Sequence, residues 1–418
     1  MSLSLDRSVT KPAAKYAPHR WLLARAFHAA SGFLLRRLML GLETGSIVFI
    51  LPSGREISFG TGRDGPEAVM RFRSYAGIFR LVFGGYIGLG EGYVAGDWST
   101  PSLRTVFRFG LANRESLQKR LSGTVAVRLI SAVLRIAHRN SVSGSHRNIS
   151  YHYDLGNGFY ESWLDPSMTY SSGIFETETA TLEEAQVAKY RRIIDNLQIE
   201  PHHRVLEIGC GWGGFAEFVA REMGASVTAV TVSQKQYDYA ANRITRAGLQ
   251  DKVEIQLRDY RALSKQYDRI VSIEMLEAVG EPYWPGYFRI LNESLTQDGQ
   301  AMIQVITVPD NRFDYYRSES DFVQRHIFPG GMLLSPGEMD RQSGAAGLVM
   351  KDAFFFGRSY GITLDHWHDR FSSNWPHIEA IGFDERFRRL WSYYLNYTAA
   401  GFHAGTIDVG QFLLIKSR

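Results

Sequence analysis

The chain has 418 residues, of which 44% are hydrophobic, 13% aromatic and 22% charged, and its formal net charge is +4. A chain of this length is expected to form two or three domains with sizeable cores. Its single cysteine excludes an internal disulfide and a cysteine-rich zinc site, so we expect no metal centre. We also expect no nucleic-acid partner.

Basic residues are concentrated in two segments of the first third of the chain. Residues 1–45 hold seven Lys or Arg against two acids, and residues 114–147 hold seven against one. Residues 19–40 and 114–140 have the apolar spacing of amphipathic helices. Such helices bind anionic membrane surfaces, and each nearby basic side chain contributes about 1 kcal/mol. Solvated helix faces are the alternative interpretation.

A small α+β module is predicted between these helices, over residues 40–110. Residues 47–51 and 56–59 flank a Pro-Ser-Gly-Arg turn, which indicates a hairpin, and residues 69–73 alternate like another strand. The serine-rich run 141–145 is typical of a linker.

We therefore predict an amino-terminal, lipid-associated domain over residues 1–140 and a second domain over residues 148–418. The longest apolar run near the start, residues 26–35, is too short to span a bilayer, and no signal peptide is evident. The expected location is the cytoplasm, with peripheral attachment to the inner face of the membrane. A homodimer is left open.

Strand and helix patterns alternate through the second domain, which is typical of a doubly wound, Rossmann-like α/β fold. The last segment alternates in polarity and is expected to pair as an edge strand. The six predicted strands are residues 205–208, 226–231, 253–256, 269–273, 301–306 and 411–416.

Residues 205–214 carry the most informative motif. A short apolar strand contains Glu207, and Gly209, Gly211 and Gly213 then alternate before a helical pattern. Side chains at these glycines would block the approach of a ligand to the backbone. The Gly-x-Gly-x-Gly spacing and the preceding acid favour S-adenosylmethionine over a dinucleotide, whose fingerprint is Gly-x-Gly-x-x-Gly. A nicotinamide or flavin enzyme and a purely structural loop are the alternatives.

Polar residues follow the next strands of the predicted sheet. Thr231 and Gln236 lie where a ribose would bind, with a helix cap as the alternative interpretation. Asp259 and Tyr260 follow the third strand and suit an adenine, with a surface turn as the alternative.

Two acids, Glu274 and Glu277, follow the fourth strand, where class I methyltransferases meet their substrate. Three interpretations are open for each acid: a catalytic base, an anchor that hydrogen-bonds a ligand, or a solvated surface charge. The aromatic-rich segment 150–175 lacks an apolar period and is expected to cover the methionine end of the ligand.

Ordered motifs in the second domain resemble the cyclopropane-fatty-acyl-phospholipid synthase family. The resemblance is close over residues 148–418 and loose before them. The motifs are HYDLGN (152–157), LDP (164–166), MTYSS (168–172), EIGCGWG (207–213), EAVG (277–280), IFPGG (327–331) and YYLN (393–396).

The resemblance implies a class I methyltransferase that transfers a methyl group from S-adenosylmethionine to a cis double bond in an acyl chain of a membrane phospholipid. A proton then passes to a bound bicarbonate ion and a cyclopropane ring closes. Glu277 matches the glutamate that anchors the bicarbonate. The cofactor is assigned to Tyr170, Ser171, Glu207, Gly209, Gly211, Gly213, Thr231, Gln236, Asp259 and Tyr260.

The sequence departs from the bacterial type of this family at four positions, which that type fills with cysteine, histidine, tyrosine and cysteine. They are Ser172, Gln304, His368 and Thr398. The plant-like branch resembles this chain at Ser172 and Gln304, so these two residues are compatible with ring closure. Ser172, Gln304 and His368 are expected to surround the proton acceptor together with Glu277, with His368 as a proton relay. Thr398 is also counted among the candidate catalytic residues.

Aromatic faces stabilise carbocations, and Tyr170, Trp367 and Tyr397 are the candidates here. Three alternatives to ring formation stay open: a methyl-branched or methylene product, methylation of a soluble small molecule, and a lipid-binding protein with an inactive methyltransferase domain.

Overall fold

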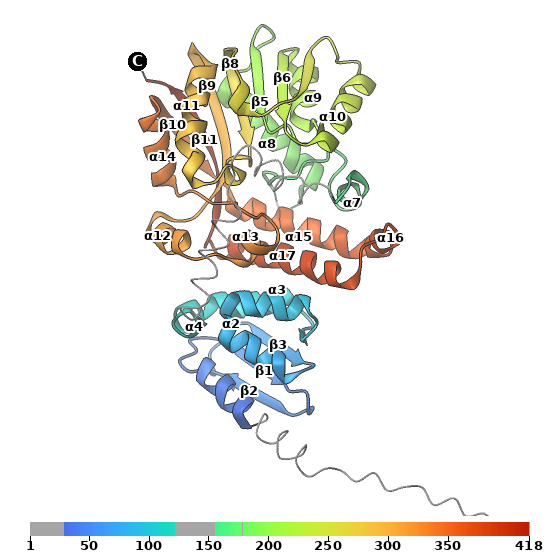
Figure 1. Ribbon diagram of the computed structural model, residues 1–418, viewed down its shortest axis with the longest axis vertical. Helices are drawn as coiled ribbons and strands as arrows, with labels where there is room; N and C mark the ends of the chain where they lie inside the picture. Colours follow the sequence, from blue (N-terminus) through green and yellow to red (C-terminus); the bar gives the residue numbers. More distant parts are fainter. Residues whose placement is uncertain (1–28, 122–154, 178, 418) are drawn as a thin grey trace, which may run out of the picture.

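The computed structural model describes residues 29–121, 155–177 and 179–417. Within these residues, two β-sheets lie toward opposite ends of an elongated molecule, with a layer of helices between them (Figure 1). The smaller sheet is formed by the amino-terminal part, and the larger sheet by the remainder of the chain.

The amino-terminal sheet has four strands in the order β2-β1-β3-β4. β1 (Ser46–Ile50) and β2 (Glu56–Gly60) form the predicted antiparallel hairpin. β3 (Glu67–Phe72) pairs in parallel with β1, and the short β4 (Trp98–Ser99) pairs with β3. The predicted α+β module is therefore confirmed.

Helix α2 (Tyr75–Val94) follows β3, although its second half is rich in glycine. These glycines permit close packing, since a Cβ at Gly90 would collide with the ring of Phe322 in α13 (Phe322–His326). Gly85 departs from helical geometry, with a φ of 58° that glycine tolerates. Tertiary packing thus outweighs the low helix propensity of glycine here.

The larger sheet has seven strands in the order β10-β11-β9-β8-β5-β6-β7. The five strands from β9 to β7 are parallel, and β10 and β11 are antiparallel additions. All six predicted strands are present. The seven are β5 (Arg204–Ile208), β6 (Ser226–Thr231), β7 (Val253–Leu257), β8 (Tyr267–Ile273), β9 (Leu295–Thr307), β10 (Leu348–Phe355) and β11 (Asp408–Lys416).

The prediction that the last strand forms the edge of the sheet is wrong. β11 lies between β9 and β10, and β10 forms the edge. The reason is visible in the residues of β10, where Lys351 and Asp352 are exposed. Charged residues protect an edge strand from pairing with other chains, whereas β11 is largely buried.

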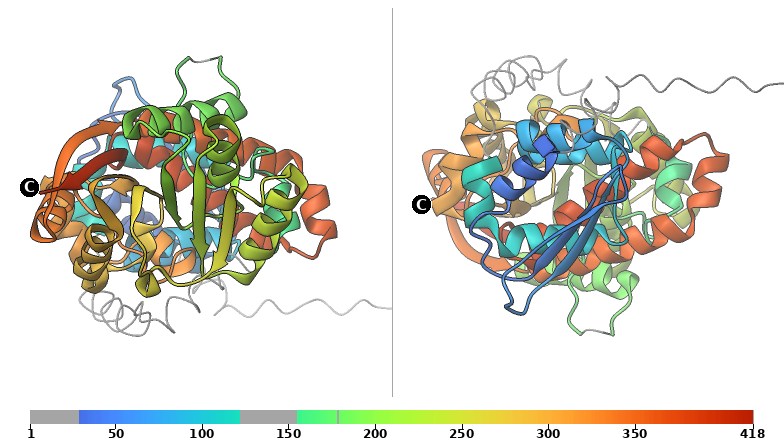
Figure 2. Two further views of the ribbon diagram at one scale, coloured as in Figure 1. Left: turned by 90° about the horizontal axis from the view of Figure 1, so that it is seen from above. Right: turned by 90° about the horizontal axis from the view of Figure 1, so that it is seen from below.

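Helices cover both faces of the larger sheet (Figure 2). β5 is buried on both sides, with Val205 facing one helix layer and Leu206 the other, which explains its continuous apolar run. One layer consists of α8 (Leu182–Leu197), α9 (Gly214–Met223) and α10 (Gln234–Ala247), and the other of α11 (Trp284–Ser294) and α14 (Pro336–Ala345).

Two long helices, α15 (Gly357–Ser373) and α17 (Glu385–His403), lie between the two sheets (Figure 1). α17 packs against α15 on one side and against α2 and α3 (Leu103–Ala112) on the other. Its Tyr393 belongs to the core of the amino-terminal sheet. Four further helices are α4 (Arg114–Leu121), α7 (Asn157–Glu161), α12 (Asp310–Ser318) and α16 (Trp375–Ala380).

The predicted domain boundary, between residues 140 and 148, lies outside the described residues. Of the two predicted basic helices, the described portions are helical over 29–38 and in α4. Across the described ranges, no helix is both long and apolar enough to cross a bilayer.

Candidate active site

A cavity of about 150 Å³ lies at the carboxyl ends of β5, β6 and β8, where open α/β sheets bind ligands. The glycine loop after β5 forms one wall, and residues 168–171 form another. Nine of the ten predicted cofactor residues line it: Tyr170, Ser171, Glu207, Gly209, Gly211, Thr231, Gln236, Asp259 and Tyr260.

The three glycines of the loop have positive φ values of 86°, 52° and 81° in chain order. A Cβ at Gly209 would lie 2.9 Å from Met275, and one at Gly213 would lie 3.0 Å from Ala240 of α10. A Cβ at Gly211 would meet no atom within 4 Å. Gly211 thus borders open space, whereas Gly213 permits helix packing and is absent from the cavity wall, which corrects its assignment to the cofactor.

Glu207 in β5 is only 3% exposed, and its Oε2 has no hydrogen-bond partner. Burial raises the pKa of its carboxyl well above the ordinary range, and the charge of Lys189 opposes this rise. Buried polar atoms are nearly always paired in native proteins. An unpaired oxygen in a cavity wall therefore suits a ligand that supplies a hydroxyl or amino donor.

The far wall of this cavity carries the residues predicted for ribose and adenine. The Thr231 hydroxyl donates to Gln236 Oε1 at 2.9 Å, so the two side chains act as a unit. Asp259 accepts a hydrogen bond at 2.6 Å from Arg261, which neutralises its charge. Tyr260 stands edge-on to Tyr287, with ring centroids 5.6 Å apart, and also borders the cavity.

Lys189 of α8 is a buried cation that sequence reasoning missed. Its Nζ donates at 2.6 Å to both Ser171 Oγ and Gln186 Oε1, and Gln186 donates at 2.9 Å to the Ser171 carbonyl. Burial lowers the pKa of Lys189 to about 7. These bonds fix the segment that carries Ser171. Two polar residues within an otherwise apolar helix stripe were the available signal.

A second cavity, of about 400 Å³, lies between the amino-terminal part and the larger sheet. Its mostly apolar walls come from α2, α3, α12, α13 and α17, together with the loop around Phe328. The two cavities share three lining residues, Tyr170, Glu274 and Ala278. Ligands bound in the two cavities would therefore meet at these residues.

Glu274 directly follows β8, and its φ of 50° is rare for a residue other than glycine. Its Oε1 accepts hydrogen bonds from Ser172 N at 2.9 Å and Gln304 Nε2 at 2.8 Å. Its Oε2 accepts a hydrogen bond from the Tyr360 hydroxyl at 2.5 Å. Burial raises the pKa of this carboxyl, and the three donors oppose the rise.

Glu277 lines only the second cavity. Its Oε1 accepts a hydrogen bond from Ile306 N at 2.7 Å, while its Oε2 is buried without a partner. Burial and, after it, the charge of Glu274 raise the pKa of Glu277 to about 8. This carboxyl is therefore largely neutral at pH 7.

Of the three other predicted catalytic residues, Ser172 and Gln304 contact Glu274 and Thr398 lines the second cavity. The backbone of Ser172 and the side chain of Gln304 bind Glu274. The Ser172 hydroxyl donates instead to the Gly173 carbonyl at 2.9 Å. Thr398 lines the second cavity, and its Oγ1 has no partner.

His368 lies away from both cavities, which corrects its expected place beside the proton acceptor. Its Nε2 is 3.4 Å from Ser372 Oγ and its Nδ1 is 3.7 Å from Asp369. Eight helical residues rotate a side chain by about 80° relative to the first. Tyr360, eight positions earlier on α15, therefore faces the site while His368 does not. Sequence reasoning missed Tyr360 because nothing in the local pattern distinguishes it from a core tyrosine.

The three aromatic candidates differ in position. Tyr170 lines both cavities, and its hydroxyl is 2.9 Å from the Tyr394 hydroxyl. Tyr397 lines the second cavity. Trp367 is fully buried behind Tyr170, at a centroid distance of 5.2 Å, and lines neither cavity. It supports the Tyr170 ring from behind.

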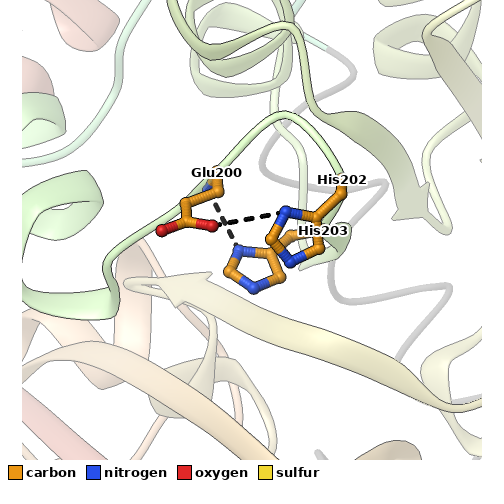
Figure 3. A group of neighbouring side chains, drawn as sticks. All are labelled: Glu200, His202 and His203. Atoms are coloured by element: carbon orange, nitrogen blue, oxygen red, sulfur yellow. Dashed lines mark hydrogen bonds and ion pairs between the residues drawn. The ribbon is translucent and has the colours of Figure 1, made fainter.

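One group in the described residues brings three metal-ligating side chains together: Glu200, His202 and His203 (Figure 3). His203 Nδ1 accepts a hydrogen bond from the Glu200 backbone N–H at 2.9 Å, and the His202 ring pairs with the Glu200 carboxylate at 3.3 Å. These contacts stabilise the turn before β5, at the opposite end of the strand from the cofactor cavity.

Comparisons with known proteins agree with this geometry. A family model described as mycolic acid cyclopropane synthetase matches residues 140–412. A tuberculostearic acid methyltransferase of Mycobacterium tuberculosis is 36% identical over 97% of this chain and 95% of its own length. The cyclopropane-fatty-acyl-phospholipid synthase of Escherichia coli K12 is 37% identical over 81% of this chain and 85% of its own.

Solved structures of cyclopropane synthases are also similar to this chain. A mycolic acid cyclopropane synthase, solved with SAH and CTAB, superposes with a TM-score of 0.61 at 28% identity, over 65% of this chain and 98% of that one. Fold and site together define a class I, S-adenosylmethionine-dependent methyltransferase. Within that class, the chain belongs to the mycolic acid cyclopropane synthetase family.

Proposed function

We propose that this enzyme methylates the cis double bond of an unsaturated phospholipid acyl chain and forms a cyclopropane ring. The observation that carries the proposal is the contact between the two cavities at Tyr170, Glu274 and Ala278. S-adenosylmethionine, when bound in the smaller cavity, supplies an electrophilic methyl group. An alkene is a weak nucleophile, so it must be held close to that group in a dry, aligned geometry.

The apolar lining of the larger cavity suits an acyl chain. Two arginines, Arg114 of α4 and Arg312 of α12, are set into that lining. Burial and, after it, the charge of Arg114 lower the pKa of Arg312. Two cations this close favour an anionic group between or beside them, such as a lipid phosphate. A soluble, polar methyl acceptor would gain little from this lining.

Ring closure requires loss of a proton from the methyl group that has just been transferred. That carbon would lie where the two cavities meet, and Glu274 is the carboxylate at this point. An acceptor confined to the acyl cavity, such as Glu277, would instead reach hydrogens of the acyl chain. The position of Glu274 thus supports the ring over a methyl-branched alkene, which would lose its proton from the acyl chain. A methylene product would also lose a proton of the new methyl group, but only after a hydride shift along the acyl chain.

A methyl-branched product is the second candidate. It is favoured by the similarity to a tuberculostearic acid methyltransferase over 97% of this chain. Both products follow from the same methyl transfer. Loss of a proton from the new methyl group closes the ring, whereas loss of a proton from the acyl chain leaves a methyl-branched alkene.

We further propose that the enzyme acts from the cytoplasmic surface of a membrane, to which it attaches peripherally. Support comes from the exposed Phe83 of α2, which is next to Gly84 in the wall of the acyl cavity. The basic excess of residues 1–45 and 114–147 adds attraction to anionic lipid.

The test is to incubate the enzyme with methyl-labelled S-adenosylmethionine and vesicles of a mono-unsaturated phospholipid, and to identify the acyl product by mass spectrometry. A labelled, saturated product with one ring is expected. A product that retains a carbon–carbon double bond would favour the second candidate. Labelling of free fatty acid but not of phospholipid would refute the phospholipid substrate.

A further inference from the structure

We propose that the carboxylate of Glu274 is itself the proton acceptor of this enzyme, and that it replaces the bicarbonate ion implied by the family resemblance. The inference rests on the proposed function and names the base of that reaction. It predicts an enzyme that works without bicarbonate.

The first argument is that the binding site for a small oxyanion is already filled. Ser172 and Gln304 are the residues that the family resemblance implies around such an ion. The backbone N–H of Ser172 and the side chain of Gln304 both donate hydrogen bonds to Glu274 Oε1. Tyr360 donates to the other oxygen at 2.5 Å. A planar carboxylate with three donors occupies this set, so a bicarbonate bound to the same donors would collide with it.

The second argument is the backbone of Glu274. Its φ of 50° is one of three positive values among the non-glycine residues of the described segments. Such a conformation costs on the order of 1–3 kcal/mol and persists where the surroundings fix it, often at active sites. Here it directs the side chain to the one place where both cavities meet. Glycine would relieve the strain, so the carboxylate has a role that offsets it.

The chemistry balances without a further reactant. The alkene electron pair forms a bond to the methyl carbon as the carbon–sulfur bond breaks, which leaves a cation on the neighbouring acyl carbon. One C–H bond of the new methyl group then breaks, and its electron pair closes the ring. The proton forms an O–H bond with Glu274 and is later released to water.

The charges around Glu274 are suited to a base that must be ionised before the step and protonated after it. Lys189 attracts the ionised form, and Glu277 is the other acid facing it. Burial raises the pKa of Glu274, which makes the carboxylate a stronger acceptor than an exposed one. Tyr360 holds one oxygen while the site is charged, and so acts as a positioning residue.

The experiment compares Glu274→Gln, Glu274→Gly and the parent enzyme in buffer freed of carbon dioxide, with and without added bicarbonate. The glutamine fills the space without a basic oxygen, whereas the glycine suits the positive φ and leaves the three donors around an open space. Glu254→Gln, at an exposed position of β7, is the matched control. Thermal unfolding verifies that each variant is folded.

The parent and the Glu254 variant are expected to be equally active with and without bicarbonate. Both Glu274 variants should lose about 100-fold or more in turnover. Bicarbonate should restore about tenfold or more to Glu274→Gly and nothing to Glu274→Gln. A parent enzyme that stops without bicarbonate, or a glycine variant that is fully active without it, would overturn the proposal. Either of these results leaves acyl methylation standing, whereas a parent that labels no acyl chain under any condition refutes the proposed function itself.

Discussion

The two cavities that meet at Glu274 are built in different ways. The cofactor cavity is formed by loops that directly follow β5, β6, β7 and β8, together with one preceding segment. The acyl cavity is formed by helices from both halves of the described chain, from Gly84 in α2 to Gly401 in α17. The first is thus a property of one sheet, whereas the second exists only because two parts of the molecule pack together.

The two cavities therefore differ in how they would select the cofactor and the acyl chain. In the function proposed above, the cofactor is recognised by the backbone of a tight loop and by buried polar atoms such as Glu207 Oε2, which tolerate little change. In the same proposal, the acyl chain is recognised by apolar surface, for which substitutions that keep volume cost little. Mutations should therefore affect the two cavities with different severity.

The largest effect is expected from Gly211→Val. Its Cβ would enter the cofactor cavity, where no protein atom lies within 4 Å. We expect S-adenosylmethionine affinity, measured by calorimetry, to fall by about 100-fold or more. The free energy of unfolding should decrease by only about 1–2 kcal/mol, which is the cost of a side chain at positive φ.

Gly248→Val is the matched control for that loss. Gly248 also has a positive φ, of 68°, and open space around its Cβ position, but it follows α10 outside both cavities. The two variants should lose similar stability, and only the first should lose cofactor affinity. Equal affinities would remove Gly211 from the binding site.

The same contrast explains what could be predicted from sequence. The glycine loop, the positions of six strands and seven of the nine cofactor-cavity residues are local in sequence, because these seven lie within or just after their own strands. Tyr170 and Ser171 precede the sheet and were assigned through the family resemblance. The acyl cavity and the partners of Glu274 are not local. Tyr360 reaches Glu274 across 86 positions of sequence, through a helix whose pattern reads as ordinary core. A motif match by position selected His368 on that helix, and only the rotation of α15 distinguishes the two.

That distinction leads to the second prediction, a pair of substitutions on α15. Tyr360→Phe removes a hydrogen bond to a carboxylate but keeps the ring that stacks on Phe402 at 4.4 Å. Loss of such a bond costs about 1.5–3 kcal/mol, so turnover should fall by roughly tenfold to a hundredfold with little change in KM. His368→Phe should leave turnover within about twofold, because the half-buried His368 lines neither cavity. The reverse order of effects would restore His368 to the site.

A third prediction concerns the acid of the acyl cavity and depends on pH. Because burial raises the pKa of Glu277 to about 8, its carboxyl gains a negative charge only as the pH rises through that value. A nearby anion stabilises the cationic acyl intermediate, so parent turnover should increase above pH 8, by on the order of tenfold. Glu277→Gln resembles the neutral form, and its rate should match the parent at pH 7 and lack the increase. A variant that is equally impaired at all pH values would assign Glu277 a role that does not depend on its charge.

The smallest effect should come from Phe83, which precedes Gly84 in the wall of the acyl cavity, is 55% exposed and stacks on Phe79 at 6.1 Å. If this ring enters a lipid surface, its partial burial contributes about 1 kcal/mol, and Phe83→Ser should lower activity on anionic vesicles roughly threefold to fivefold. Cofactor affinity should not change, because α2 is remote from the glycine loop. Ile381→Ser is the matched control, since Ile381 is 45% exposed in a loop that borders neither cavity. Equal losses of vesicle activity in both variants would mean that general surface hydrophobicity, rather than the position of Phe83 beside the acyl cavity, governs vesicle binding. Added salt should then change the vesicle activity of both variants to the same extent.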